Sequence, residues 1–159
     1  MEDFRPVKIQ RSDSALNIAM PGDVTYLAHI REFIADLALK VGFTEEDVAK
    51  IEMSVDEACT NVVEHAYSTG KKWHVQNRNP EIRLAIQADE NQLVIEINDH
   101  GQHFDFSAYQ PAEPQTRAQD MHTGGYGIAI MRKFMDEVGF HSSAATGNTL
   151  RLVKYLKKT

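Results

Sequence analysis

The chain has 159 residues, of which 42% are hydrophobic and 25% are charged. This is the range of ordinary globular domains, and the length is enough for one domain with a sizeable core, so we expect a single domain over residues 1–159. The formal net charge of −6 argues against direct, non-specific binding of nucleic acid. A short basic run near the C-terminus is typical of a solvated strand end or tail, at Arg151, Lys154, Lys157 and Lys158.

Cysteine content and apolar runs bear on the compartment. Cys59 is the only cysteine, so no disulfide can form within the chain, and a reducing compartment is expected. Residues 1–10 are charged and lack the apolar core of a signal peptide. No apolar run approaches the length that spans a bilayer. We therefore expect a soluble, cytoplasmic protein that does not enter a membrane.

Two helices are predicted in the first half of the chain, after an edge strand at residues 7–10 and a short apolar stretch at residues 15–19. The first helix follows Pro21-Gly22-Asp23 and carries apolar residues on one side. Gly42 is suited to end it, because glycine adopts the left-handed conformation common after helices. The second helix is expected at residues 44–67, with three acids in its first turn, where the helix dipole favours them.

The second half of the chain is predicted to contain two hairpins and a third helix. Alternating apolar residues on both sides of Asp89-Glu90-Asn91 indicate the first hairpin. Gly139 is placed to cap the third helix. The segments are, in chain order, a polar loop at 68–80, strands at 82–88 and 93–97, a long polar loop at 105–123, a helix at 124–138, and strands at 140–145 and 148–156 around a turn at Thr146-Gly147. Helices covering one face of a mixed, mostly antiparallel sheet would give an α+β two-layer sandwich.

The second predicted helix holds the first motif with a chemical meaning. Glu57 and Asn61 lie one helical turn apart, on the side opposite the apolar stripe. A carboxylate and an amide so placed can hold a hard cation through oxygen, and the carboxylate can accept a proton from an attacking hydroxyl. Taken alone, the pattern is more typical of a solvated polar face on an ordinary amphipathic helix.

A second motif, Asp99-His100-Gly101, stands at the end of a predicted strand. An aspartate there can accept a hydrogen bond from an exocyclic amine, and a glycine lets a planar ring approach the backbone. Taken alone, this motif is also a common turn sequence.

A third motif, Gly124-Gly125-Tyr126-Gly127, stands at the start of a predicted helix. Glycines there leave backbone N–H groups accessible to an anion, which the partial positive charge of a helix N-terminus also favours. A flexible hinge before a helix has the same sequence character.

The order and spacing of the three motifs resemble the ATP-binding fold shared by type II topoisomerases, mismatch-repair ATPases, chaperones and sensor histidine kinases. The resemblance extends over residues 20–156, and within that superfamily the chain is most similar to the stand-alone anti-sigma factor serine kinases. The matching stretches are Glu57-Ala58-Cys59-Thr60-Asn61 with His65-Ala66-Tyr67, Asp99 and Gly101 with Phe104-Asp105, Gly124-Gly125 and Gly127 with Met131, Met135-Asp136-Glu137-Val138, and Gly147 with Thr149.

The resemblance implies ATP and Mg²⁺ as cofactors. Asn61 would ligate the Mg²⁺ ion that bridges the phosphates, and Glu57 would be the catalytic base that takes the proton of a partner serine. Asp99 would bond the adenine amino group, while segment 105–123 would act as a lid. The implied nucleotide contacts are Asn61, Asp99, Gly101 (room for the ring), Gly124, Gly125 and Gly127 (the phosphates), Ile128, and Thr149 (support at the adenine end).

The same resemblance implies an anti-sigma factor with serine-protein kinase activity. Such a protein sequesters a sigma factor, phosphorylates a serine of an anti-sigma factor antagonist protein and forms a homodimer. An alternative of a different class is a nucleotide-gated regulatory binding module of the same fold without phosphotransfer. The presence of Glu57 favours the kinase, because nucleotide binding alone requires no base.

Overall fold

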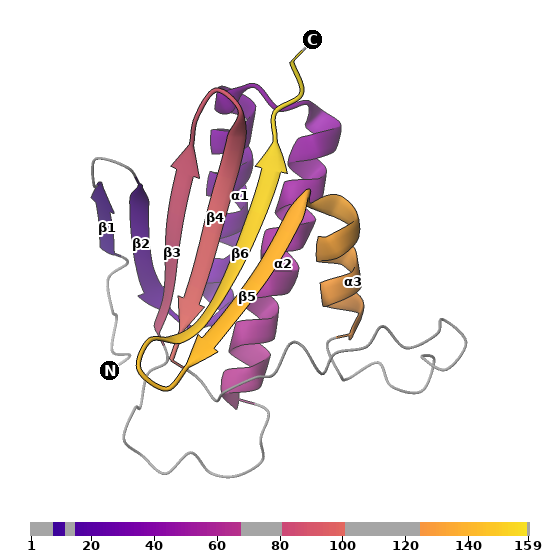
Figure 1. Ribbon diagram of the computed structural model, residues 1–159. Coiled ribbons are helices and arrows are strands. Elements are labelled where there is room, and N and C mark those ends of the chain that lie inside the picture. The colour runs from indigo at the N-terminus through magenta and orange to yellow at the C-terminus, as the bar shows by residue number, and fades with distance from the viewer. Residues whose placement is uncertain (1–7, 12–14, 68–80, 101–124, 159) are drawn as a thin grey trace.

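Three helices cover one face of a six-stranded sheet in the computed structural model, which describes residues 8–11, 15–67, 81–100 and 125–158 (Figure 1). The elements are β1 Lys8–Arg11, β2 Leu16–Pro21, α1 Val24–Val41, α2 Glu45–Tyr67, β3 Glu81–Ala88, β4 Gln92–Asp99, α3 Gly125–Phe134, β5 Glu137–Ser143 and β6 Gly147–Tyr155. The strand order is β1-β2-β3-β4-β6-β5, and each of these pairings is antiparallel. The predicted α+β two-layer sandwich is confirmed, with antiparallel pairing throughout the described sheet.

Local signals in the sequence place the ends of α1 and the start of α2. The carboxylate of Asp23 accepts a hydrogen bond from the backbone N–H of Thr25 (2.9 Å), and this bond lowers the pKa of the Asp23 carboxyl. At the other end of α1, Gly42 takes a φ of 113° and its N–H donates to the carbonyl groups of the last turn. Thr44 caps α2, because its Oγ1 accepts from the backbone N–H of Asp47 (3.2 Å).

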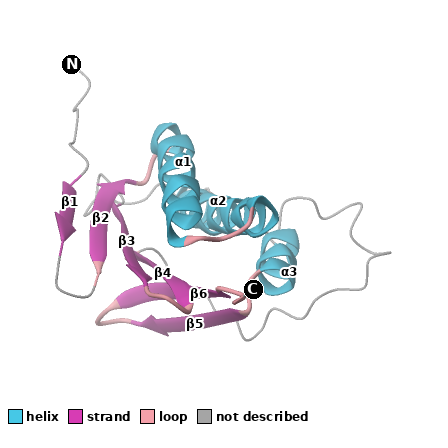
Figure 2. Cartoon of the chain, turned by 90° about the horizontal axis from the view of Figure 1, so that it is seen from above, coloured by secondary structure: helices cyan, strands magenta, loops and turns pink. Residues whose placement is uncertain are grey.

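The core lies between the helices and the sheet, and Figure 2 shows all three helices on the same side of the strands. Alternate residues of a strand point to opposite faces, so β3 and β4 each direct a row of apolar side chains at the helices. The fully buried members include Ile82, Leu84, Leu93, Ile95 and Ile97 from the strands and Ile34, Ile51 and Val55 from the helices. Burial raises the pKa of the Cys59 thiol to about 12, which makes Cys59 a protonated packing residue. None of the described helices is long and apolar enough to cross a membrane.

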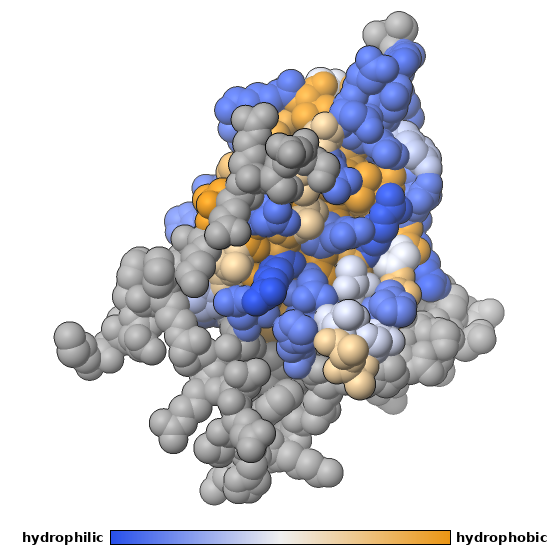
Figure 3. Space-filling view, turned by 60° about the vertical axis from the view of Figure 1, so that its left-hand side comes forward, coloured by the Kyte–Doolittle hydropathy of each residue, from blue (hydrophilic) through white to orange (hydrophobic). Residues whose placement is uncertain are grey.

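The opposite face of the sheet is not covered by any described helix. A groove of about 580 Å³ lies there. Figure 3, viewed from the side of β1, shows hydrophilic and apolar residues interspersed on this part of the surface. The groove is lined by Asn17, Ile18, Ala19, Glu81, Arg83, Leu84, Ala85, Glu96, Asn98 and Thr149.

The end of α3 differs from the sequence prediction. The helix was expected to continue to Val138 and to be capped by Gly139, but it ends at Phe134. Val138 and Gly139 lie in β5 instead. The backbone N–H of Asp136 donates to the carbonyl of Val153 on β6 (2.9 Å), which begins the pairing of the two strands. The helical spacing of the apolar residues is thus overridden by strand pairing with a distant segment.

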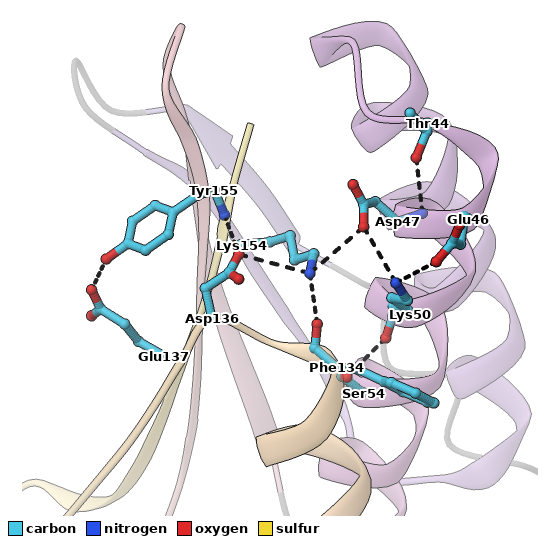
Figure 4. Close-up of polar contacts among 10 residues, drawn as sticks. All are labelled: Thr44, Glu46, Asp47, Lys50, Ser54, Phe134, Asp136, Glu137, Lys154 and Tyr155. Atoms are coloured by element: carbon cyan, nitrogen blue, oxygen red, sulfur yellow. Dashed lines mark hydrogen bonds and ion pairs between the residues drawn. The ribbon is translucent and has the colours of Figure 1, made fainter. Parts of the chain in front are cut away.

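A buried lysine joins the C-terminal end of α3 to α2 and the sheet (Figure 4). Lys154 is 5% exposed, so the expectation of a solvated strand end is wrong at this position. Its Nζ donates to the carbonyl of Phe134, the last residue of α3 (2.8 Å), and lies 3.6 Å from Oδ1 of Asp47 and 3.7 Å from Oδ2 of Asp136. One cation therefore neutralises two carboxylates and satisfies a carbonyl at a helix end.

Replacing Lys154 by methionine should lower the free energy of unfolding by about 3 kcal/mol, because it removes the buried cation that lies beside the buried Asp47 carboxylate and bonds to the carbonyl of Phe134. Lys50→Met is the matched control, since Lys50 lies 3.8 Å from the same Asp47 oxygen but is more exposed than Lys154, with 29% of its side chain accessible against 6%. It should cost far less, because exposed pairs contribute little. Urea unfolding followed by circular dichroism measures both. Equal losses would contradict the role given to burial.

Candidate functional site

The polar side of α2 lies against α3. Glu57 and Asn61 are half-buried, and a Cβ atom built on Gly127 of α3 would lie 2.8 Å from Oε2 of Glu57 and 3.1 Å from Nδ2 of Asn61. A side chain at position 127 would therefore displace these groups, and only glycine lets the backbone of α3 come so close to them. The structure brings these three predicted site residues together, so this side of α2 is an interhelical face.

The first turn of α3 adds backbone donors to the same region. α3 begins at Gly125 and has no acidic residue in its first turn, so its N-terminal partial charge is not offset by an acid of its own. The N–H groups of a first helical turn have no acceptor within the helix and are suited to anions. Figure 1 shows the N-terminal end of α3 at the same end of the molecule as the C-terminal ends of α2 and β4.

Asp99, the last residue of β4, belongs to a hydrogen-bonded series of side chains. Nδ2 of Asn148 donates to Oδ1 of Asp99 (3.1 Å), and Oγ of Ser142 donates to Oδ1 of Asn148 (2.6 Å). Asn148 is 6% exposed and in phase with the buried Leu150 and Leu152, so it points to the side that the helices cover. The carboxylate predicted to recognise a base is thus held by a buried amide.

Thr149 is not brought to Asp99. Its register partner is Asn98, whose Nδ2 donates to Oγ1 of Thr149 (3.0 Å), and both line the groove on the uncovered face of the sheet. The sequence prediction passed over Asn148, the residue that does contact Asp99. The signal for Asn148 was present, because it alternates in phase with Leu150 and Leu152 whereas Thr149 does not.

The turn between β5 and β6 is fastened to the end of β4. Nδ2 of Asn98 donates to the carbonyl groups of Thr146 (3.1 Å) and Asn148 (3.0 Å). Gly147 has a φ of 77°, and a Cβ atom on it would overlap the backbone oxygen of Asp99. Both features fix the backbone that carries the Asp99 carboxylate.

Of the remaining predicted site residues, the structure describes Ile128 and Gly125. Ile128 is 4% exposed and belongs to the hydrophobic core, so its side chain packs within the fold. Gly125 is described as the first residue of α3. Gly101, Gly124 and the expected lid at 105–123 lie outside the described residues.

The donor set between α2 and α3 fits a magnesium ion bound together with phosphates. Glu57 and Asn61 offer carboxylate and amide oxygens, which Mg²⁺ prefers. Within the described ranges there is no cluster of three or more His, Cys, Asp or Glu side chains that could hold a metal. A cation here would take its remaining ligands from phosphates and water, as Mg²⁺ commonly does.

Replacing Gly147 by alanine should lower the free energy of unfolding by roughly 2 kcal/mol, because a Cβ atom at positive φ both strains the backbone and overlaps Asp99. Gly139→Ala is the control, since a Cβ atom there would meet Cβ of Arg151 at 3.9 Å, an ordinary contact. The control should change stability by less than about 0.5 kcal/mol. Thermal unfolding compares the two, and similar losses would refute the close approach.

Comparison with known proteins identifies the family of this chain. A sequence profile of the histidine kinase-like ATPase domain matches residues 20–154. The chain is 31% identical to the serine-protein kinase RsbW of Bacillus pumilus (strain SAFR-032) over 147 residues, which are 90% of this chain and 86% of that protein. It is 29% identical to the serine-protein kinase RsbW of Bacillus subtilis (strain 168) over 145 residues, covering 89% of this chain and 85% of that protein.

A solved structure shares the fold. The RsbU and RsbW domains of Rv1364c from Mycobacterium tuberculosis superpose with a TM-score of 0.60 at 17% identity. The match covers 94% of this chain but only 34% of that longer one. The chain therefore belongs to the histidine kinase-like ATPase domain family, in the group of the RsbW serine-protein kinases.

Proposed function

We propose that this protein is an anti-sigma factor with serine-protein kinase activity, which binds Mg-ATP, sequesters a sigma factor and phosphorylates a serine of an antagonist protein. The observation that carries the proposal is the approach of Glu57 and Asn61 on α2 to Gly127 on α3. The relatives named serine-protein kinase support it, at 31% and 29% identity over most of the chain. The sigma factor, the antagonist and the homodimer are inferred from family membership.

In this proposal one end of the site binds the phosphates and the other binds adenine. When bound, Mg²⁺ supplies charge neutralisation at the phosphates, and Asn61 would hold it through Oδ1. The backbone N–H groups at the start of α3 would receive phosphate oxygens, because a helix N-terminus favours anions. Asp99 would accept a hydrogen bond from the amino group of adenine. The protein thereby positions the transferable phosphoryl group with few side chains.

Glu57 would act as the base. As the serine oxygen forms its bond to the γ-phosphorus, the bond from that phosphorus to the β,γ-bridging oxygen breaks, and ADP leaves with the bonding electrons. The serine proton passes to the Glu57 carboxylate. Phosphoryl transfer depends mainly on positioning and charge neutralisation, so a half-buried carboxylate held between two helices is suited to this role.

Glu57→Gln should reduce phosphate transfer to the antagonist serine by about 100-fold or more, since it removes the proton acceptor. Mg-ATP affinity, measured by calorimetry, should change by less than about threefold, because the amide keeps the shape of the side chain. Glu52→Gln is the control on the same helix, where Glu52 lies 3.9 Å from Arg31 of α1. Unchanged transfer in Glu57→Gln would remove Glu57 as the base, whereas absence of transfer by the unaltered protein would favour the nucleotide-gated module without phosphotransfer. Failure of the unaltered protein to bind ATP, with or without Mg²⁺, would sink both.

Gly127→Ala should impair transfer more than folding. Its Cβ atom would push away the Glu57 carboxylate, which is the end of a flexible side chain and can move at small cost to stability. We expect transfer to fall by about tenfold or more, while the free energy of unfolding changes by less than about 1 kcal/mol. Single-turnover assays and urea unfolding measure the two effects. Loss of stability with normal transfer would show that the close approach is only structural.

A further inference from the structure

The hydrogen-bonded series at Asp99 reaches the edge of the sheet. The register pairs Asp99 with Asn148 and Asn148 with Ser142, so the three residues form one row across β4, β6 and β5. Residues directly opposite in antiparallel strands point to the same face, which explains why the Asn148 side chain bonds to both Asp99 and Ser142. On the other side of Asp99 the row continues with Ile82 and Met20, which are buried and apolar.

Chemistry sets the direction of these hydrogen bonds. An ionised carboxylate only accepts, so the amide of Asn148 must turn its nitrogen toward Asp99 and its oxygen toward Ser142. Ser142 then donates its hydroxyl proton to that oxygen. Asn148 is almost fully buried, so loss of the Ser142 hydroxyl would remove a partner of a buried acceptor and loosen the amide that holds Asp99.

The backbone of Asp99 is held in place by its neighbours. Asn98 binds the β5–β6 turn through two carbonyl groups, and Gly147 packs on the backbone oxygen of Asp99. With the main chain clamped, the orientation of the carboxylate depends on its own side-chain torsions. The hydrogen bond from Asn148 restricts these torsions.

We infer that Ser142 and Asn148 are positioning residues that hold the Asp99 carboxylate as a fixed acceptor for a purine amino group and so set a preference for ATP over GTP. The inference rests on the proposed function. Adenine carries an amino group at the ring position where guanine carries a carbonyl oxygen, so a fixed carboxylate accepts from the first and repels the second. A carboxylate free to turn can instead accept from the N–H groups of guanine, which lowers the preference.

The test is a calorimetric titration of each protein with Mg-ATP and with Mg-GTP. Ser142→Ala should weaken ATP binding by about three- to tenfold, the usual effect of losing one hydrogen bond, without weakening GTP binding. Ser142→Thr keeps the hydroxyl and should keep the ratio of the two affinities. Ser143→Ala is the matched control, because the Ser143 hydroxyl bonds to Thr146 within its own turn (2.6 Å) and is not part of the row.

The ratio of the ATP affinity to the GTP affinity distinguishes a positioning role of Ser142 from a general loss of structure at the site. Equal weakening of ATP and GTP in Ser142→Ala, or no change in either, would overturn the inference. Asn148→Leu provides a second variant of similar size, and it should lower the ratio at least as much. If the unaltered protein binds neither nucleotide, the proposed function fails first and the inference fails with it. If the unaltered protein prefers ATP and both variants keep that preference, only the inference fails.

Discussion

The antiparallel register between β4 and β6 is the constraint on which both ends of this molecule depend. It pairs Asp99 with Asn148 at one end and Leu93 with Lys154 at the other. The residues of β6 that face the helices are therefore polar at both ends and apolar between them. A shift of one residue would turn these side chains to the uncovered face, because strand residues alternate between faces.

The short helix α3 links the two ends. Its ten residues extend about 15 Å. At its C-terminus the carbonyl of Phe134 is held by Lys154, and near its N-terminus Gly127 lies against Glu57 and Asn61. Lys154 of β6, which carries the buried ion pair with Asp47, therefore contacts α3 at the end opposite to the proposed chemistry. α3 packs against α2, so the spacing between Glu57, the proposed base, and the first turn of α3, the proposed phosphate site, follows from how these two helices pack.

Much of this arrangement could be predicted from sequence, because its signals are local. The side chains of Asp23 and Thr44 cap the starts of helices, and the backbone of Gly42 ends one. The spacing of Glu57 and Asn61 needs only one turn of helix. The errors concern features that depend on distant pairing. Val138 has a spacing that fits a helix but pairs with Leu152, and Lys154 belongs to a basic run but is buried by contacts with Asp47 and Phe134. Asn148 was passed over because the family resemblance pointed to the neighbouring Thr149, whereas the alternation of the strand places Asn148 beside Asp99.

The buried cysteine gives the protein a built-in reporter. Only the thiolate reacts with alkylating reagents, and burial keeps the pKa of Cys59 near 12. Its side chain projects from α2 into the core, so modification requires an opening of the structure that exposes this part of the core. The rate at which the native protein is alkylated therefore measures how often that opening occurs, and a second cysteine introduced at an exposed position can be labelled selectively while Cys59 stays unmodified.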